Sequence, residues 1–301
     1  MGAQDDFDAL LPFVFEHASV RAALIRLSRT SREILACHPY PAPLARALAE
    51  TVAASALLAS TLKLNGSLVV QLSGDGPVSL IVVECDDALH VRATARWNEA
   101  LVAELGADAS LCALAGGPSH GRLTLTLDPR SIEGLYQGIV SLDTTSIAAS
   151  IEHYLQTSEQ LPSRLWLRAD ESSVFGLLMQ RLPESGASDD ATWFRIADEA
   201  DAAWNRALAA PTFTAVLRTL FPHDDLRMFG SRPVTFQCKC SLARVARALR
   251  IAGRDEVDAA VAERGMVEVT CEFCNRRYTF APDEARALIA SPPPSSPAAR
   301  P

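Results

Sequence analysis

Residues 67–97 read SLVVQLSGDGPVSLIVVECDDALHVRATARW. Two apolar runs, 67–73 and 78–84, flank the turn-forming tetrapeptide GDGP, and a third run, 89–97, alternates polar with apolar side chains. Alternation with a period of two indicates a strand with one solvated face, so this stretch predicts a three-stranded antiparallel meander. GDGP is also similar to a phosphate-binding loop, but no helix follows it, and a hairpin turn is the favoured interpretation.

The segments around the meander add strands and helices in separate groups. Further strands are predicted at 122–127, 134–142 and 164–168, with a strand or a helix start at 174–179 and a strand followed by a helix within 7–37. One helix is predicted from Pro43 to Leu62, and another after a cap at Asp143 or Thr144. Because strands follow one another directly, with helices between the groups, the sequence predicts an α+β fold with an N-terminal antiparallel-sheet-plus-helices domain.

Composition limits the classes of function. The chain has 301 residues, 49% hydrophobic and 21% charged, with a net charge of −8. These values are ordinary for a globular protein, and the negative charge argues against general affinity for nucleic acid or an anionic membrane. The N-terminus lacks a basic and apolar signal peptide, and the most hydrophobic long window, 44–62, contains Arg46 and Glu50. We therefore expect a cytoplasmic protein without a membrane span.

Four of the seven cysteines form two close pairs, Cys238 with Cys240 and Cys271 with Cys274. Two such pairs separated by a long loop predict a tetrahedral site in which four thiolates hold one Zn²⁺ ion, at roughly 2.3 Å per bond. Cys-x-Cys is tighter than the spacing of most zinc knuckles, and its two sulfur atoms are neighbours when the metal leaves. Spacing alone leaves three interpretations: a structural zinc ribbon, a thiol-based switch, or unrelated free cysteines.

The other reactive residue types form no catalytic pattern. Cys37, Cys85 and Cys112 are single and are predicted to be small buried side chains. The six histidines lack the spacing of metal ligands, and neither a G-x-S-x-G nor a P-loop motif occurs. Four cysteines would also close the coordination shell of a zinc ion. We therefore expect no enzymatic activity.

A change in composition at 183–188 marks a domain boundary, and two helices are predicted after it. The first follows a cap at Asp189 or Asp190, and the second spans 212–221. Their large apolar residues are Trp193, Phe194, Ile196 and Trp204 in the first helix, and Phe213, Val216, Leu217 and Leu220 in the second. We expect these helices to pack on a domain in the resting state. A functional interpretation is that the same surface is uncovered under some condition.

The cysteine pairs belong to a small C-terminal α+β module. Its predicted elements are a helix from Ser241 to Gly253, a helix at 255–264, strands at 266–270 and 277–280, and a last helix from Pro282. A module of this size is marginal on its own, so a structural metal worth roughly 10–16 kcal/mol in apparent binding free energy would supply most of its stability. The proline-rich tail, 291–301, is predicted to be disordered.

With these features, the chain resembles the redox-regulated thirty-three-kilodalton heat-shock protein family of bacterial cytosolic holdase chaperones. The resemblance spans nearly the whole chain. It is carried by GDGP at 74–77, YQGIV at 136–140, residues 152–162 with their SEQLP ending, F-x-C-x-C-S at 236–241, and C-x-x-C at 271–274. The sequence departs from the family in its proline-rich tail and in the three single cysteines.

The resemblance implies three parts: an N-terminal substrate-handling domain (1–182), a metastable helical linker (183–232) and a zinc redox-switch module (233–290). It also implies roles for the paired cysteines, which would hold one Zn²⁺ ion in the reduced, inactive protein. On oxidation, Cys238 would pair with Cys240 and Cys271 with Cys274, and the zinc would be released.

The resemblance further implies what oxidation does to the rest of the chain. The switch and the linker would unfold, and the exposed apolar surface would hold unfolding client proteins without ATP. The client-binding candidates are Trp193, Phe194, Ile196, Trp204, Phe213, Leu217 and Leu220. A homodimer of the oxidised form is compatible with this interpretation.

A zinc-ribbon module that binds nucleic acid or the ribosome is the alternative function. It is suggested by five arginines near the cysteine pairs, namely Arg244, Arg247, Arg250, Arg276 and Arg277. The net negative charge of the chain and the nearly balanced charges of the module argue against it.

Overall fold

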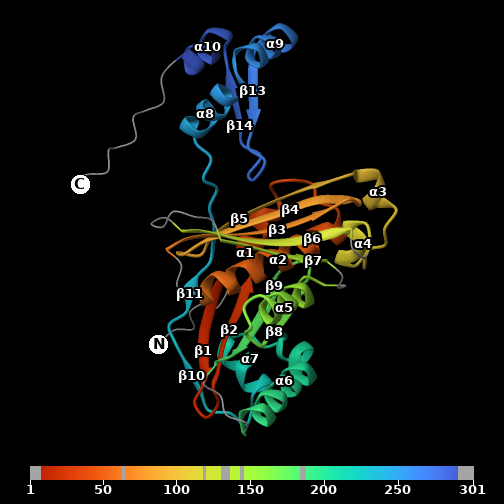
Figure 1. Ribbon diagram of the computed structural model, residues 1–301, viewed down its shortest axis with the longest axis vertical. Helices are drawn as coiled ribbons and strands as arrows, with labels where there is room; N and C mark the ends of the chain where they lie inside the picture. The colour runs from red at the N-terminus through yellow and green to blue at the C-terminus, as the bar shows by residue number, and fades with distance from the viewer. Residues whose placement is uncertain are drawn as a thin grey trace, which may run out of the picture. The chain divides into compact units, whose positions relative to one another are not determined.

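The computed structural model describes residues 8–62, 65–117, 120–129, 136–142, 146–183 and 188–290. Two compact units are present, Met1–Gln237 and Cys238–Pro301. The first contains two large β-sheets with helices packed on them, and the second contains a two-stranded sheet with helices (Figure 1). The predicted α+β fold class is confirmed.

The meander sheet contains residues 67–97 and has the strand order β12-β5-β4-β3-β6-β7. Its strands are β3 (Gly66–Gly74), β4 (Val78–Asp86), β5 (His90–Trp97), β6 (Gly121–Pro129), β7 (Tyr136–Ser141) and the short β12 (Thr235–Phe236). The five long strands pair antiparallel, whereas β12 joins β5 in parallel. The predicted meander is confirmed, and GDGP lies at the β3–β4 turn.

The N-terminal sheet has the order β10-β1-β2-β9-β8, and β11 also pairs with β1. Its strands are β1 (Ala9–Phe15), β2 (Val20–Leu27), β8 (Ser163–Ala169), β9 (Val174–Arg181), β10 (Leu226–Met228) and β11 (Arg232–Pro233). The first segment of the chain thus forms two strands before helix α1 (Arg29–Leu35), where only one was predicted. The strand β9 was ambiguous in the sequence because nearly all its residues are buried, which removes the period-two alternation.

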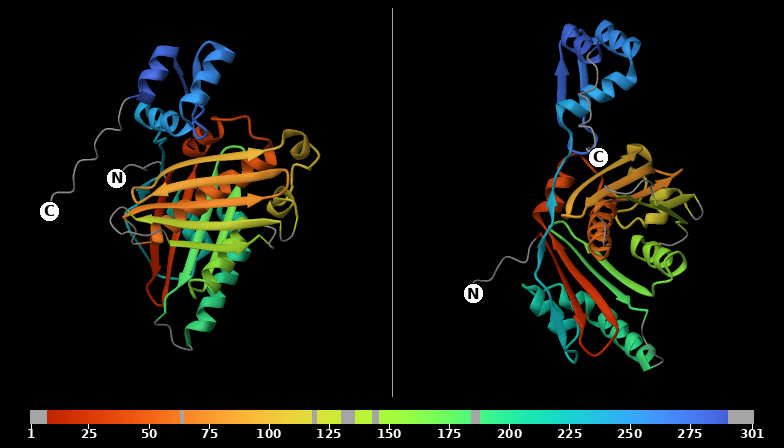
Figure 2. Two further views of the ribbon diagram at one scale, coloured as in Figure 1. Left: turned by 45° about the horizontal axis from the view of Figure 1, so that its top comes forward. Right: turned by 60° about the vertical axis from the view of Figure 1, so that its left-hand side comes forward.

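Helices α2 (Ala42–Thr61) and α5 (Ile147–Thr157) lie between the two sheets (Figure 2). The alanine-rich α2 is buried nearly all round, which lets strands of both sheets approach it closely. Among the described helices, α2 is the one long and apolar enough to cross a membrane by length and composition. Its most apolar window is 72% buried inside the structure, however, as in the core helix of a globular domain.

Two short helices and the cap of α5 complete this part of the first unit. Helices α3 (Glu99–Ala103) and α4 (Leu111–Ala115) follow β5 and were not predicted. Helix α5 is capped by Ser146, whose hydroxyl accepts from the backbone N–H of Ala149 at 3.2 Å. The caps predicted for this helix, Asp143 and Thr144, lie outside the described residues.

Helices α6 (Ser188–Ala207) and α7 (Phe213–Leu220) cover the other face of the N-terminal sheet (Figure 2). We call this pair the α6–α7 layer. Six of its predicted client-binding residues are no more than 7% exposed, namely Trp193, Ile196, Trp204, Phe213, Leu217 and Leu220. Phe194, in contrast, is 63% exposed. Because α6 begins at Ser188, the predicted caps Asp189 and Asp190 lie within its first turn.

The strap, residues 225–237, runs from the α6–α7 layer to the first cysteine along the edges of both sheets. Its strands β10 and β11 pair with β1, and β12 pairs with β5. Val234, between β11 and β12, is fully buried in the core of the first unit. Gln237 donates its backbone N–H to the carbonyl oxygen of Val91 at 3.0 Å, so backbone bonding continues to the residue before Cys238.

The second unit is a small module around a two-stranded sheet. Its elements are α8 (Leu242–Ala252), α9 (Arg254–Arg264), β13 (Val267–Thr270), β14 (Arg277–Phe280) and α10 (Pro282–Ala290). These elements match the predicted ones, including the cap at Ser241, which accepts from the N–H of Arg244. Its buried apolar cluster consists of Val245, Leu249, Val257, Val267, Phe280 and Ala285. The tail predicted to be disordered, 291–301, lies outside the described residues.

Candidate metal centre

The four paired cysteines converge in the second unit. Cys238 and Cys240 lie in the extended segment before α8, and Cys271 and Cys274 lie in the turn between β13 and β14. The Sγ atoms of Cys238 and Cys271 are 3.6 Å apart, those of Cys240 and Cys274 are 3.4 Å apart, and all four lie within 4.8 Å of one another. The fold therefore brings both pairs to one point.

The dimensions of the cluster suit a tetrahedral metal ion. Four thiolates around a central ion with metal–sulfur bonds of 2.3 Å have sulfur–sulfur edges of about 3.8 Å. The observed contacts of 3.4 and 3.6 Å lie close to that edge length, and no pair exceeds 4.8 Å. Within the described ranges, this is the only cluster of three or more potential ligand residues. The cluster can hold a metal ion with a closed shell of four sulfur ligands.

Backbone hydrogen bonds build the turn that carries the second pair. Asn275 has a φ of +56°, a left-handed conformation that asparagine tolerates better than most residues. Its N–H donates to the carbonyl oxygen of Cys271 at 2.8 Å, and the N–H of Cys271 donates to the carbonyl oxygen of Arg276 at 2.9 Å. The turn therefore closes on itself and holds Cys271 and Cys274 on one side.

Tyr278 on β14 contributes a polar contact to the cluster. Its hydroxyl donates to the Sγ of Cys240 at 3.3 Å. Burial alone would raise the pKa of Cys240, but the hydrogen bonds of Tyr278 and the neighbouring thiols lower it to about 7. Burial raises the pKa of Cys238 and of Cys274. Sequence reasoning missed Tyr278 because a tyrosine on a short strand carries no spacing signal of its own.

None of the four paired cysteines forms a disulfide bond in this structure. The two short sulfur contacts join Cys238 to Cys271 and Cys240 to Cys274, across the close pairs of the sequence rather than within them. Both separations are far longer than a disulfide bond of about 2.05 Å. The oxidised pairing that the resemblance implies, Cys238 with Cys240 and Cys271 with Cys274, stays a prediction.

The three single cysteines lie in the first unit. Cys85 is fully buried, as predicted. Cys37 and Cys112 are partly exposed, so the prediction that they are buried is wrong for both. Cys37 follows the end of α1, and its Sγ contacts the carbonyl oxygen of Glu33 at 3.3 Å. Thiol titrations of the intact chain will therefore detect more than the metal centre.

Comparisons with known proteins agree with this architecture. The family model described as Hsp33 protein matches residues 8–281. The chain is 38% identical over 286 residues to the 33 kDa chaperonin of Methylobacillus flagellatus, covering 94% of this chain and 95% of the relative. It is 39% identical over 297 residues to the 33 kDa chaperonin of Pseudomonas syringae pv. tomato, covering 95% of this chain and 94% of the relative.

The fold also has a counterpart among solved structures. The crystal structure of the 33 kDa chaperonin from Thermotoga maritima superposes with a TM-score of 0.73, at 19% identity, over 94% of this chain and 98% of that one. At this identity the likeness concerns the fold alone. The family model and the sequence relatives carry the assignment: this chain belongs to the Hsp33 family.

Proposed function

We propose that this chain is a redox-regulated, ATP-independent holdase that binds unfolding proteins under oxidative stress. The observation that carries the proposal is the cluster of four thiols within 4.8 Å of one another, in a unit whose buried core has six residues among those described. The 33 kDa chaperonins to which the chain is similar support the same function. In the reduced protein the four cysteines hold one Zn²⁺ ion, since thiolate sulfur and tetrahedral geometry suit zinc.

Oxidation by a peroxide removes the ligands of that ion. Bound zinc keeps the thiols deprotonated, and the thiolate is the form that peroxides oxidise. One thiolate attacks a peroxide oxygen to give a sulfenic acid and hydroxide, and a second thiolate displaces the sulfenic oxygen to form the disulfide. Each disulfide thus transfers two electrons to one hydrogen peroxide, which takes up two protons and becomes two waters. Two rounds join Cys238 to Cys240 and Cys271 to Cys274, and no thiolate is left for zinc.

Loss of the metal unfolds the second unit. Its apolar cluster is small, and five helices and strands depend on it. Structural zinc contributes roughly 10–16 kcal/mol of apparent binding free energy in small domains, which is more than a core of this size supplies. The unit therefore cannot retain its fold once all four thiolates are consumed.

The strap is the route by which this unfolding reaches the first unit. It continues directly into Cys238, and its edge strands are only two or three residues long. Short strands held by few backbone bonds are the segments that open first. When the second unit unfolds, we expect the strap to detach from β1 and β5, which leaves the α6–α7 layer held on the sheet by its apolar packing and by side-chain hydrogen bonds such as that of Trp166 to Asp201.

The client surface is the apolar face of the α6–α7 layer. Trp193, Ile196, Trp204, Phe213, Leu217 and Leu220 are covered in the resting state, so the layer must move before they can bind a client. Phe194 is exposed already and is the weakest of the predicted contacts. The clients are unfolded or partly unfolded proteins, which display apolar side chains without a specific sequence.

The test measures zinc and holdase activity together. Zinc release is followed with a chromogenic chelator, and aggregation of a chemically denatured protein by light scattering, before and after peroxide at raised temperature. We expect one zinc per chain to be released and aggregation to be suppressed only afterwards. Peptide mass spectrometry of the oxidised protein identifies the disulfides. Zinc retention with unchanged aggregation would contradict the switch, and a Cys238–Cys271 disulfide would contradict the proposed pairing.

Nucleic-acid binding is the less favoured function, and the arginines of the module explain why. Arg277 pairs with Glu268 at 3.3 Å, and Arg250 donates to the carbonyl oxygen of Leu288 at 3.0 Å. These two cations therefore already have partners within the module. We expect no RNA binding that weakens steeply with salt. We also expect oxidised chains to associate as homodimers through their uncovered surfaces, which light scattering after chromatography would detect.

A further inference from the structure

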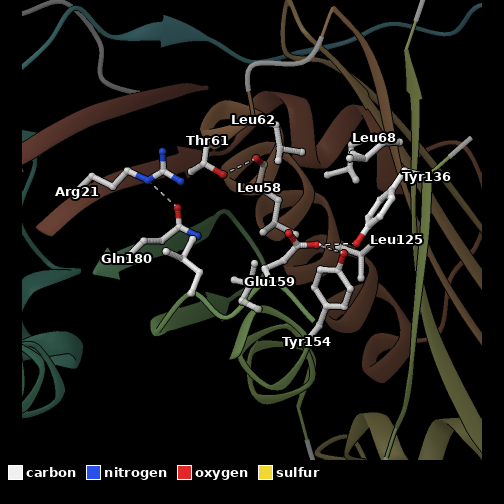
Figure 3. A pocket seen from close by; sticks show the side chains of 13 residues that line it. Arg21, Leu58, Thr61, Leu62, Leu68, Leu125, Tyr136, Tyr154, Glu159 and Gln180 are labelled. Carbon is white, nitrogen blue, oxygen red and sulfur yellow. Dashed lines mark hydrogen bonds between the residues drawn. The ribbon is translucent and has the colours of Figure 1, made fainter. Parts of the chain in front are cut away.

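The first unit contains a cavity of about 480 Å³ that the zinc switch does not use (Figure 3). Most of its wall is aliphatic, with leucines contributed by α2, β3, β6 and α5, among them Leu58, Leu68, Leu125 and Leu155. Cavities that bind small molecules typically measure about 300–1,000 Å³ and combine an apolar wall with a few polar groups. The volume and the wall of this cavity are those of a small-molecule site.

One side of the cavity carries a cationic side chain, that of Arg21. Arg21 on β2 donates its Nε–H to Oε1 of Gln180 on β9 at 3.0 Å (Figure 3). Gln180 is 1% exposed, and burial lowers the pKa of Arg21, as expected for a charge that has lost part of its hydration. No carboxylate within the described ranges forms an ion pair with Arg21. Its terminal NH₂ groups can therefore donate to an anionic ligand.

The other side of the cavity carries a carboxylate whose hydrogen-bond donors are already in place. The hydroxyls of Tyr154 and Tyr136 both donate to Oε1 of Glu159, at 2.7 and 3.2 Å (Figure 3). Burial and the neighbouring Glu159 raise the pKa of Tyr154, so its hydroxyl stays protonated and bonded. Gly138 on β7 makes this arrangement possible, because a Cβ there would lie 2.2 Å from the Tyr154 ring. A negatively charged ligand group is repelled from this side and directed toward Arg21.

Two stretches that carry the family resemblance meet at this cavity. YQGIV, at 136–140, supplies Tyr136, and SEQLP, at 158–162, supplies Glu159 and Leu161. Neither stretch belongs to the second unit, which holds the metal centre. The zinc switch therefore leaves both stretches without an assigned role, and the cavity gives them a common one.

We propose that the cavity binds a single-chain aliphatic carboxylate, with its head group on Arg21 and its chain among the leucines. The planar guanidinium matches a carboxylate through two parallel hydrogen bonds, which are strongest where water is excluded. The aliphatic chain covers leucine side chains that otherwise line an open space. Glu159, on the far side, fixes the direction of the ligand. This site is independent of the metal centre and of its oxidation.

The test uses the reduced, zinc-loaded full chain with decanoate as the probe, below the concentration at which decanoate self-associates. Calorimetric titration should give one binding site per chain. Decanol, which has the same chain without the charge, should bind at least tenfold more weakly. Spectra of the protein with ¹³C-labelled leucine methyl groups should shift at Leu58, Leu68, Leu125 and Leu155. Equal affinity for decanol, many sites per chain, or no shift at these leucines would overturn the proposal.

Variants locate the head group. Arg21→Met keeps an apolar stem of similar length and should weaken decanoate binding at least tenfold, while Arg21→Lys should recover part of the loss. Arg122→Met is the matched control, because Arg122 is exposed on β6 and does not line the cavity. If Arg21→Met fails to fold by circular dichroism, Leu125→Trp tests the same site by filling it. Wild-type affinity in a folded Arg21→Met or Leu125→Trp protein would overturn the assignment.

Discussion

The C-terminal module and the α6–α7 layer both place helices against a β-sheet, but different forces hold them. The apolar cluster of the module contains one aromatic residue, Phe280. The cluster under the α6–α7 layer contains two tryptophans of α6 and three phenylalanine rings in mutual contact, Phe13, Phe15 and Phe221, with ring centroids 5.0–6.2 Å apart. The module depends on four sulfur atoms, whereas the layer depends on apolar surface removed from water.

Because of this difference, the two regions respond to different stimuli. An oxidant changes the thiols directly, but it does not change the packing of Trp204 or Leu217 against the sheet. Releasing the layer therefore requires a second input, such as raised temperature, once the strap has detached. A protein built this way would respond to oxidation and unfolding stress in combination more strongly than to either alone. Removing one support at a time tests this comparison.

The largest effect is expected from losing one sulfur ligand. In Cys271→Ser, three thiolates remain, and we expect the zinc content to fall below one per chain and hydrogen exchange to become fast throughout 242–290. A closed four-sulfur site contributes most of the stability of such a module, so the loss should be of the order of several kcal/mol. Cys112→Ser, in the first unit, is the control and should keep its zinc. Slow exchange in a metal-free Cys271→Ser module would mean that the apolar cluster suffices.

A smaller effect is expected where the layer itself is weakened. Trp204 is 7% exposed, and truncating a buried tryptophan typically costs about 3–5 kcal/mol. In reduced Trp204→Ala, we expect faster hydrogen exchange in α6 and α7 while the zinc content stays at one per chain. Phe194→Ala is the matched control on the same helix, because Phe194 is 63% exposed and its loss should cost less than about 0.5 kcal/mol. Zinc loss in Trp204→Ala would show that the two regions are not held separately.

Removing a single polar contact should weaken the same layer less than truncating Trp204 does. Asp201 on α6 accepts from Nε1 of Trp166 at 2.6 Å and from Arg164 at 2.9 Å, which ties α6 to β8. Asp201→Ala leaves the Trp166 donor, on a side chain only 8% exposed, without this partner, at a cost of about 1–3 kcal/mol. We expect the oxidised variant to suppress aggregation at a lower temperature than the wild type. Asp198→Ala removes an exposed carboxylate from the same helix, and an equal shift in that control would rule out a specific role for Asp201.

How far the sequence predicted these regions depends on how local their determinants are. The cysteine pairs, the Ser241 cap and the meander strands were predictable because spacing, capping and alternation are properties of neighbouring residues. The strap was not, because strands of two or three residues such as Arg232–Pro233 have no periodicity and exist only where a sheet edge pairs with them. The cavity was not predicted for a similar reason: Arg21 and Gln180 lie on neighbouring strands but are 159 positions apart in the chain.

The smallest predicted effect concerns the rate at which the module responds. The Tyr278 hydroxyl donates to Cys240 at 3.3 Å, and such a bond stabilises the sulfur lone pairs that attack a peroxide. Tyr278→Phe keeps the ring in the module but removes this donor, so zinc should stay bound while its release by peroxide becomes about two- to tenfold faster, the range that corresponds to one hydrogen bond of about 0.5–1.5 kcal/mol. Thr279→Val, on the same strand, is the control. Because this change leaves both the four ligands and the α6–α7 layer intact, it alters how quickly the thiols react without altering how firmly the layer is held. An unchanged release rate would mean that access of the oxidant, rather than the nucleophilicity of Cys240, limits the first step.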